Sequence, residues 1–240
     1  SFYQQIWLHE RGRPASRDRY VFGKDFPRVA EIRLEASPSG KLVLAHVAHG
    51  DGGDFEHFLM NEKGEWRQLA RLADNVKQVH FGLDGNLYVL SRLRAPRGKL
   101  LRLAPARPAL ERAQVVVPES DAVIQTFLAT RSRLYVVDLL GGPSRLRSFD
   151  TQGKPGSDIP ILPISAVNAL EALEGDAFLF RNESFSEPPG FYRYDAKLEK
   201  TQKTALVQAT PVSFTDAEVS VEQCRSQDGT SVPMTIVAAK

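Results

Sequence analysis

Short runs of apolar residues recur along the chain, each preceded by a turn rich in Gly, Asp, Ser or Asn. Four such runs begin at Leu42, Leu87, Leu134 and Ala177, with spacings of 45, 47 and 43 residues. Another apolar run precedes each turn, as Val79–Phe81 does before Leu87. Two apolar runs on either side of a tight turn are typical of a β-hairpin. The pattern therefore predicts the same hairpin four times.

Each repeat also contains a second pair of strand-like runs. In the second repeat they are 98–103 and 113–117, and in the fourth they are 190–195 and 201–206. Four strands in about 45 residues are typical of one blade of a β-propeller. The first two runs of each repeat are nearly continuously apolar, which indicates burial on both faces, whereas the third runs alternate. We expect an all-β protein with four complete blades of four antiparallel strands between about residues 29 and 210.

Further strand-like runs lie outside the four repeats. They are Phe2–His9, Tyr20–Phe22, Val219–Cys224 and Val232–Ala238. One hypothesis is that they pair as a hybrid fifth blade and close a small ring, which would cover open blade edges. The alternative is an open arc that other parts of the protein or a second chain complete. A β-sandwich is a further alternative, although sandwiches do not usually repeat at a fixed interval.

Composition excludes several classes of partner. The hydrophobic content of 42% and the charged content of 25% are typical of a folded globular protein, and the net charge is only +2. The basic residues Arg92, Arg94 and Arg97 are interpreted as solvated loop charges, because no aromatic residues alternate with them to stack on bases. No apolar run approaches the ~18 residues that a membrane helix needs. We expect a soluble cytoplasmic or periplasmic protein with no nucleic-acid or membrane partner.

The first residues and the single cysteine narrow the interpretation further. The first residues lack both the basic and the apolar region of a signal peptide, and the opening in strand-like sequence without methionine suggests a cut chain. Cys224 is alone, which excludes an internal disulfide framework and a multi-cysteine metal site. It lies in an apolar run, so we interpret it as a strand residue rather than a nucleophile.

Motifs for enzymatic chemistry are missing from the repeats. Ser144 follows Gly142 and Pro143 but is followed by Arg145, so it does not complete a Gly-x-Ser-x-Gly nucleophile elbow. The glycine-rich segment 50–54 lacks the Lys-Ser/Thr pair of a phosphate-binding loop. We therefore expect no catalytic and no cofactor-binding residue in this chain, and no cofactor.

Several possible metal ligands lie close together between residues 46 and 57. They are His46, His49, Asp51, Asp54, Glu56 and His57. His46 and His49 are three positions apart, so on a strand their side chains point to opposite faces and do not share one ion. We expect no metal site, and we interpret His9 and His80 as isolated structural residues.

The end of the sequence carries the most specific motif. Residues 226–237 read Ser-Gln-Asp-Gly-Thr-Ser-Val-Pro-Met-Thr-Ile-Val. This phrase is similar to Ser-Lys-Asp-Gly-Thr-Lys-Val-Pro-Met-Phe-Ile-Val, which opens the catalytic domain of the prolyl oligopeptidases, a family of serine peptidases. Segments 1–22, 118–120 and 182–189 resemble the same family in part, so the resemblance covers essentially the whole chain.

This resemblance implies a parent enzyme with two parts. An α/β-hydrolase domain carries a Ser-Asp-His triad and cleaves after proline, and a seven-bladed propeller covers it and restricts access to peptides. Residues 1–216 would then form part of the propeller, and residues 217–240 the connection and the opening strands of the hydrolase domain. The triad would lie beyond Lys240, so the chain alone should be inactive. The family's propeller also directs a basic residue at the substrate, where this sequence has Ala48.

Three functions remain open at this level. The first is a non-catalytic propeller that gates access to the hydrolase domain, with that domain and short proline-containing peptides as partners. The second is an independent propeller that binds a peptide or a protein. The third is an enzyme whose metal or hydrolytic site is built on loops.

Overall fold

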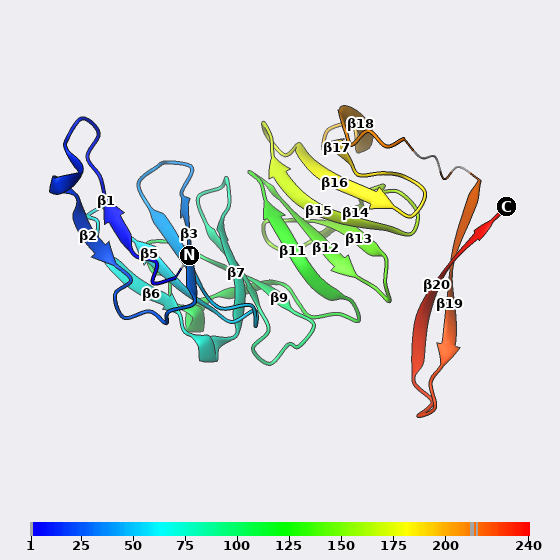
Figure 1. Ribbon diagram of the computed structural model, residues 1–240, viewed down its shortest axis with the longest axis horizontal. Helices are drawn as coiled ribbons and strands as arrows, with labels where there is room; N and C mark the ends of the chain where they lie inside the picture. Colours follow the sequence, from blue (N-terminus) through cyan, green and yellow to red (C-terminus); the bar gives the residue numbers. More distant parts are fainter. Residues whose placement is uncertain (1, 212–213, 215) are drawn as a thin grey trace.

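The structure, a computed structural model, describes residues 2–211, 214 and 216–240, and these residues form strands and turns without an α-helix. Four four-stranded antiparallel sheets stand side by side in an open arc (Figure 1). The expected all-β class with four-stranded blades is confirmed. The only helical segments among the described residues are the 3-10 turns η1 (Ala15–Arg17), η2 (Leu72–Asp74) and η3 (Leu110–Arg112).

In each blade the strands follow one another in chain order, so that every pair of neighbours is a hairpin. Blade 1 consists of β3 (Ala30–Ala36), β4 (Val43–His49), β5 (Phe55–Met60) and β6 (Trp66–Ala70). Blade 2 consists of β7 (Val76–Phe81), β8 (Leu87–Ser91), β9 (Lys99–Leu103) and β10 (Gln114–Val117). Blade 3 consists of β11 (Val123–Ala129), β12 (Arg133–Leu139), β13 (Ser144–Asp150) and β14 (Pro155–Asp158). Blade 4 consists of β15 (Ser165–Ala172), β16 (Phe178–Ser184), β17 (Gly190–Asp195) and β18 (Lys200–Val207).

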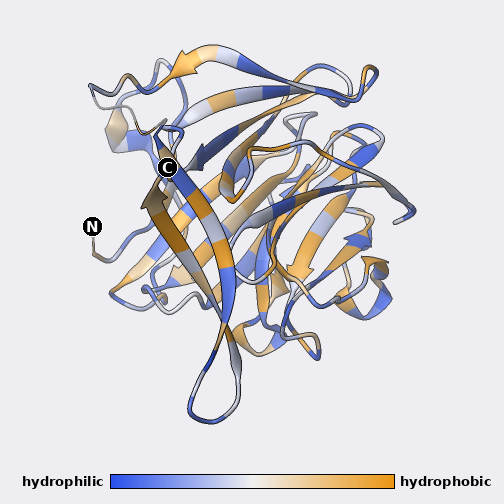
Figure 2. Ribbon diagram, turned by 90° about the vertical axis from the view of Figure 1, so that its right-hand side faces the viewer, coloured by the Kyte–Doolittle hydropathy of each residue, from blue (hydrophilic) through white to orange (hydrophobic). Residues whose placement is uncertain are grey.

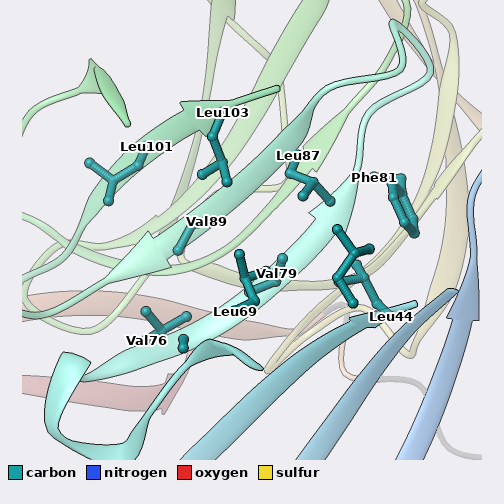
Figure 3. Close-up of a cluster of buried hydrophobic side chains, with 11 residues drawn as sticks. Leu44, Leu69, Val76, Val79, Phe81, Leu87, Val89, Leu101 and Leu103 are labelled. Atoms are coloured by element: carbon teal, nitrogen blue, oxygen red, sulfur yellow. The ribbon is translucent and has the colours of Figure 1, made fainter. Parts of the chain in front are cut away.

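The hydrophobic core lies between the blades as three successive clusters. Figure 3 shows the first, in which Leu44 of blade 1 packs with Val79, Leu87 and Val89 of blade 2. Equivalent clusters join blade 2 to blade 3 and blade 3 to blade 4. Each blade therefore needs a neighbour to bury its apolar faces, which is the physical basis of a repeat architecture.

Burial differs between the first two strands of a blade, which the sequence pattern treated alike. The second strands contain no exposed residue, and all five residues of β8 are buried. The first strands β3 and β15 instead contain several exposed positions. The first strands of adjacent blades contact one another, as β7 and β11 do, and they place polar side chains at these junctions.

The hypothesis of a hybrid fifth blade is wrong. The hairpin of β1 (Ile6–Leu8) and β2 (Arg19–Phe22) and the hairpin of β19 (Ala217–Arg225) and β20 (Ser231–Ala239) are separate two-stranded sheets. They lie at opposite ends of the arc (Figure 1). The first hairpin is held on blade 1 by Phe22, which stacks on Trp66 with ring centroids 4.6 Å apart. The second follows blade 4, so the length of the arc separates the strands that would have to pair.

None of the helical segments among the described residues is long and apolar enough to span a membrane.

Candidate functional site

The residues considered for catalysis have structural roles. The hydroxyl of Ser144 accepts a hydrogen bond of 3.0 Å from the backbone N–H of Val167, which links blade 3 to blade 4. Cys224 lies on β19 and its Sγ is 3.7 Å from Sδ of Met234 on β20. Ala48 is inside β4, where it pairs with the neighbouring strands rather than standing in a loop. None of these three residues is placed as part of a nucleophile–base pair.

Two of the possible metal ligands, His46 and His49, lie on opposite faces of β4, as their spacing in the sequence predicts. His49 bonds Glu56 with 2.9 Å between Nε2 and Oε2, whereas His46 lies on the other face of β4 beside His57. Among the described residues, no group of three His, Cys, Asp or Glu side chains has a geometry that could hold a metal ion.

His9 and His80 are not isolated, contrary to the sequence interpretation. Nδ1 of His9 is 2.7 Å from Oδ1 of Asp18, and His80 belongs to a larger group. Nδ1 of His80 is 2.7 Å from Oε2 of Glu35, and the Nδ1 atoms of His46 and His57 are 3.1 Å apart. These four residues, the histidine–glutamate cluster, come from β3, β4, β5 and β7 and join blade 1 to blade 2. Sequence spacing gave no signal for the cluster because it forms only when the first strand of blade 2 packs on blade 1.

The proton positions in the cluster follow from its geometry. His57 Nε2 faces the carbonyl oxygen of Val76 at 3.4 Å, so this nitrogen carries the proton and donates. In a neutral ring the Nδ1 atom of His57 then accepts, and Nδ1–H of His46 donates to it. The other nitrogen of His46 lies 3.6 Å from the Glu35 carboxylate.

The same arrangement shifts two pKa values. Burial disfavours ionisation of Glu35, but its interactions with His46 and His80 outweigh this effect and lower the carboxyl pKa from 4.5 to about 2. Burial lowers the pKa of His57 from 6.5 to about 3, and positive charge on His46 adds to this effect. His57 thus stays neutral at pH values where an exposed histidine binds a proton.

These shifts predict that the protein loses stability in acid. Below pH 6.5 the unfolded chain protonates His57 and the folded chain does not, so stability falls as the pH drops from about 6.5 towards 3. Glu35 adds a loss below about pH 4.5, because its folded-state pKa is also depressed. Between pH 6.5 and pH 4 we expect a loss of roughly 3 kcal/mol from His57, measured as the free energy of unfolding in urea.

One variant separates this effect from general acid sensitivity. His57→Gln should flatten the pH dependence by about one bound proton, because the titrating group is gone. An unchanged slope in His57→Gln would contradict the assignment.

Polar side chains also join the later blades, one repeat apart in sequence. Gln78 accepts a 3.1 Å hydrogen bond from the hydroxyl of Thr126, which is 48 residues away. Asp176 accepts from the hydroxyls of Thr130 and Ser132 at 2.8 and 2.6 Å. Burial opposes ionisation of Asp176, but these bonds win and hold its pKa below the usual range. Each blade junction thus has its own polar contacts beside an apolar core.

The C-terminal hairpin of β19 and β20 meets one face of the arc. A cavity of about 420 Å³ lies between Thr235 of the hairpin and the loops that contain Pro143 of blade 3 and Phe185 of blade 4. The Cβ position of Gly141 is 4.0 Å from the Pro233 ring. Those loops join the second and third strands of their blades, so this end of each blade is the face next to the hairpin.

The four-stranded sheets and the apolar clusters between them define a run of propeller blades. The family model of the prolyl oligopeptidase N-terminal β-propeller domain matches residues 1–207. The chain therefore belongs to this family, as the sequence resemblance implied.

Solved structures of related peptidases support the assignment. One is a prolyl endopeptidase from a study of inter-domain dynamics in catalysis and specificity; it is 26% identical with a TM-score of 0.83, and the match covers 99% of this chain and 35% of that chain. Oligopeptidase B from Trypanosoma brucei with covalently bound antipain and apo prolyl oligopeptidase B from Galerina marginata share the fold. Each is 15% identical, with TM-scores of 0.79 and 0.78, covering 98% of this chain and 35% of theirs.

This chain thus spans about a third of the length of these structures. No curated protein matches it.

Proposed function

We propose that this chain is the non-catalytic propeller part of a prolyl oligopeptidase-like serine endopeptidase. In this role it gates the access of peptides to an α/β-hydrolase domain that follows it. The observation that carries the proposal is the hairpin of β19 and β20, which extends from blade 4 and pairs with no other strand in the described chain. The family match supports the propeller assignment of the residues before it.

The surface of this hairpin supports the division of the chain at residues 216 and 217. Val232, Met234 and Val237 are 46%, 41% and 51% exposed, although all three are apolar. Figure 2 shows apolar and polar residues mixed along both strands of the hairpin, which stands in front of the rest of the chain in this view. A sheet with apolar residues and free edges favours further strands beside it. An independent peptide-binding propeller would have no use for such a hairpin.

The proposed mechanism is selection by size. Blades that pack through continuous apolar clusters and polar junction contacts form a stiff wall, which leaves room for an extended peptide and excludes a folded domain. Specificity then arises from exclusion, and the propeller need not contribute any group to bond cleavage. The partners in this proposal are the hydrolase domain and short proline-containing peptides.

We predict that the full-length protein cleaves a short proline-containing peptide at least about 100-fold more efficiently than the same sequence in a loop of a stable folded protein. The measurement is kcat/KM for both substrates. The control is the second substrate after it has been permanently unfolded, because an unfolded chain should regain most of the rate. Equal turnover of the folded and unfolded substrate would contradict gating.

A further inference from the structure

The histidine–glutamate cluster supplies three bonds between blade 1 and blade 2. Nε2 of His57 faces the carbonyl oxygen of Val76 at 3.4 Å, and the Glu35 carboxylate accepts from the backbone N–H of Phe81 at 3.0 Å and contacts His80 at 2.7 Å. Blades 3 and 4 contain no histidine. The polar contacts at the later junctions use hydroxyl, amide and carboxylate groups instead. A proton bound by His57 therefore acts at the first junction.

Exposure to solvent falls stepwise through the cluster towards His57. The side chains of His80, Glu35 and His46 are 42%, 30% and 14% exposed, and His57 is 1% exposed. Oε2 of Glu35 lies 2.7 Å from Nδ1 of His80 and 3.6 Å from Nε2 of His46. The Nδ1 atoms of His46 and His57 are 3.1 Å apart. The cluster thus connects solvent to a buried histidine through a series of polar contacts.

His46 can bind one proton without the loss of any contact. Its Nε2 is buried without a hydrogen-bond partner, and the Glu35 carboxylate is 3.6 Å away. A proton on this nitrogen faces an anion, so it strengthens the junction. The carboxylate stays ionised in mild acid, because its pKa is about 2 although burial opposes ionisation.

A second proton has no site while the junction is closed. Nε2 of His57 already donates to Val76, so the added proton would have to bind Nδ1. That nitrogen accepts the proton of His46 Nδ1 at 3.1 Å. With both nitrogens protonated, two N–H groups face each other and their hydrogen bond is lost. Burial also keeps water from the new cation, which makes its charge costly.

The remaining charged groups around His57 do not compensate this second charge. The further charged side chains on this face of blade 1 and on the adjacent strand β7 are Glu31 and Arg33 on β3, Arg67 on β6 and Lys77 on β7. The first three are exposed, so solvent screens them. Lys77 is a cation whose Nζ donates to the carbonyl of Gly53 at 2.7 Å. The cluster therefore depends on Glu35, which already faces His46 and His80.

We propose that the histidine–glutamate cluster is a proton-controlled switch between blades 1 and 2. Neutral His57 keeps the two blades joined, and a proton on its Nδ1 separates them while blades 2, 3 and 4 stay packed. This inference concerns the junction itself and does not rest on the proposed function. In a gate, an open junction would interrupt the wall that excludes folded substrates.

Three backbone amides report on the three junctions separately. The N–H of Phe81 donates from blade 2 to blade 1, that of Ile124 from blade 3 to blade 2, and that of Val167 from blade 4 to blade 3. Hydrogen exchange of the full-length protein is measured at about pH 7 and about pH 4.5 with single-amide resolution. The rates are expressed as protection factors, so that the pH dependence of the chemical exchange step cancels.

The protection factor of Phe81 should fall about 70-fold between these pH values. Burial holds the pKa of His57 at about 3 in the closed junction, so opening binds one more proton over this range. The protection factors of Ile124 and Val167 should fall less than about fivefold. Equal losses at all three amides would overturn the proposal, because acid would then act on the whole fold. So would an unchanged protection factor of Phe81.

Two histidine variants assign the effect to one side chain. His57→Gln can still donate to Val76 but does not titrate, so Phe81 should stay protected at about pH 4.5. His49→Gln is the matched control, because His49 lies on the opposite face of β4, where it bonds Glu56 at 2.9 Å, and Phe81 should still lose protection. A loss that persists in His57→Gln would contradict the switch. The comparison of the three amides in the unmodified protein holds even if a variant does not fold.

Discussion

Replacing Asp138 with alanine should destabilise the protein by about 3–5 kcal/mol, one of the two largest effects expected of a single substitution. Asp138 lies on β12 with its side chain fully buried. Both of its oxygens bind Arg147 on the adjacent strand β13, with 2.9 Å between Oδ1 and Nη2 and a second bond from Nε to Oδ2. The guanidinium group also lies over the ring of Phe149, 5.0 Å from its centroid.

The magnitude follows from what the substitution leaves behind. Only 15% of the Arg147 side chain is exposed, so Asp138→Ala strands a cation in a region where water cannot solvate it. Removing one partner of a buried pair costs much more than the pair itself contributes, because the desolvation of the other partner is no longer offset. The measurement is the free energy of unfolding in urea.

Two further variants make the interpretation specific. Asp158→Ala removes a 3.0 Å pair with Arg145 in the same blade, but both side chains are about half exposed, so a loss of less than about 1 kcal/mol is expected. The double variant Asp138→Leu with Arg147→Met should recover a large part of the stability lost by Asp138→Ala, because no unpaired charge remains. A loss in Asp138→Ala no larger than in Asp158→Ala would show that the buried pair is unimportant.

Replacing Gly153 with alanine should be about as harmful, at roughly 3–4 kcal/mol. Gly153 is in the turn between β13 and β14 of blade 3, with a φ of 92°. A Cβ atom there would lie 1.9 Å from the carbonyl oxygen of Val116, in the outer strand of blade 2. The close atom belongs to the backbone of Val116, and this residue is only 2% exposed. Neither Gly153 nor Val116 can therefore move without separating the two blades.

A second glycine isolates the effect of the contact. Gly85 also has a positive φ, of 82°, but no atom lies within 4 Å of its Cβ position. Gly85→Ala should therefore show only the backbone cost of about 1–2 kcal/mol. The midpoint of thermal unfolding provides the comparison, and an equal decrease for both variants would mean that the contact with Val116 does not matter.

The histidine–glutamate cluster shows where sequence reasoning stopped. The opposite orientation of His46 and His49 was predicted correctly from strand geometry. His80 was interpreted as isolated, although it lies 2.7 Å from Glu35. The error arose because the two residues are 45 positions apart, and only the packing of one blade on the next brings them together.

The terminal strands show the same division. Their existence as strands was predictable from apolar runs and from the turn Asp228–Gly229, because a hairpin pairs residues that are close in sequence. The sequence did not show that the two hairpins stay separate, and the hybrid fifth blade was wrong. Pairing between the two ends would depend on the curvature of the whole arc, which no local pattern records.

The sequence by itself determined the all-β class, the repeat of about 45 residues, the four-stranded blade and, through residues 226–237, the family. These features depend on hairpins and on motifs, whose parts are near one another in the chain. Only the tertiary structure decided which groups meet between blades, such as His80 with Glu35 and Gly153 with Val116. Such contacts depend on how blades stack and twist, and residue types alone do not encode that geometry in a readable pattern.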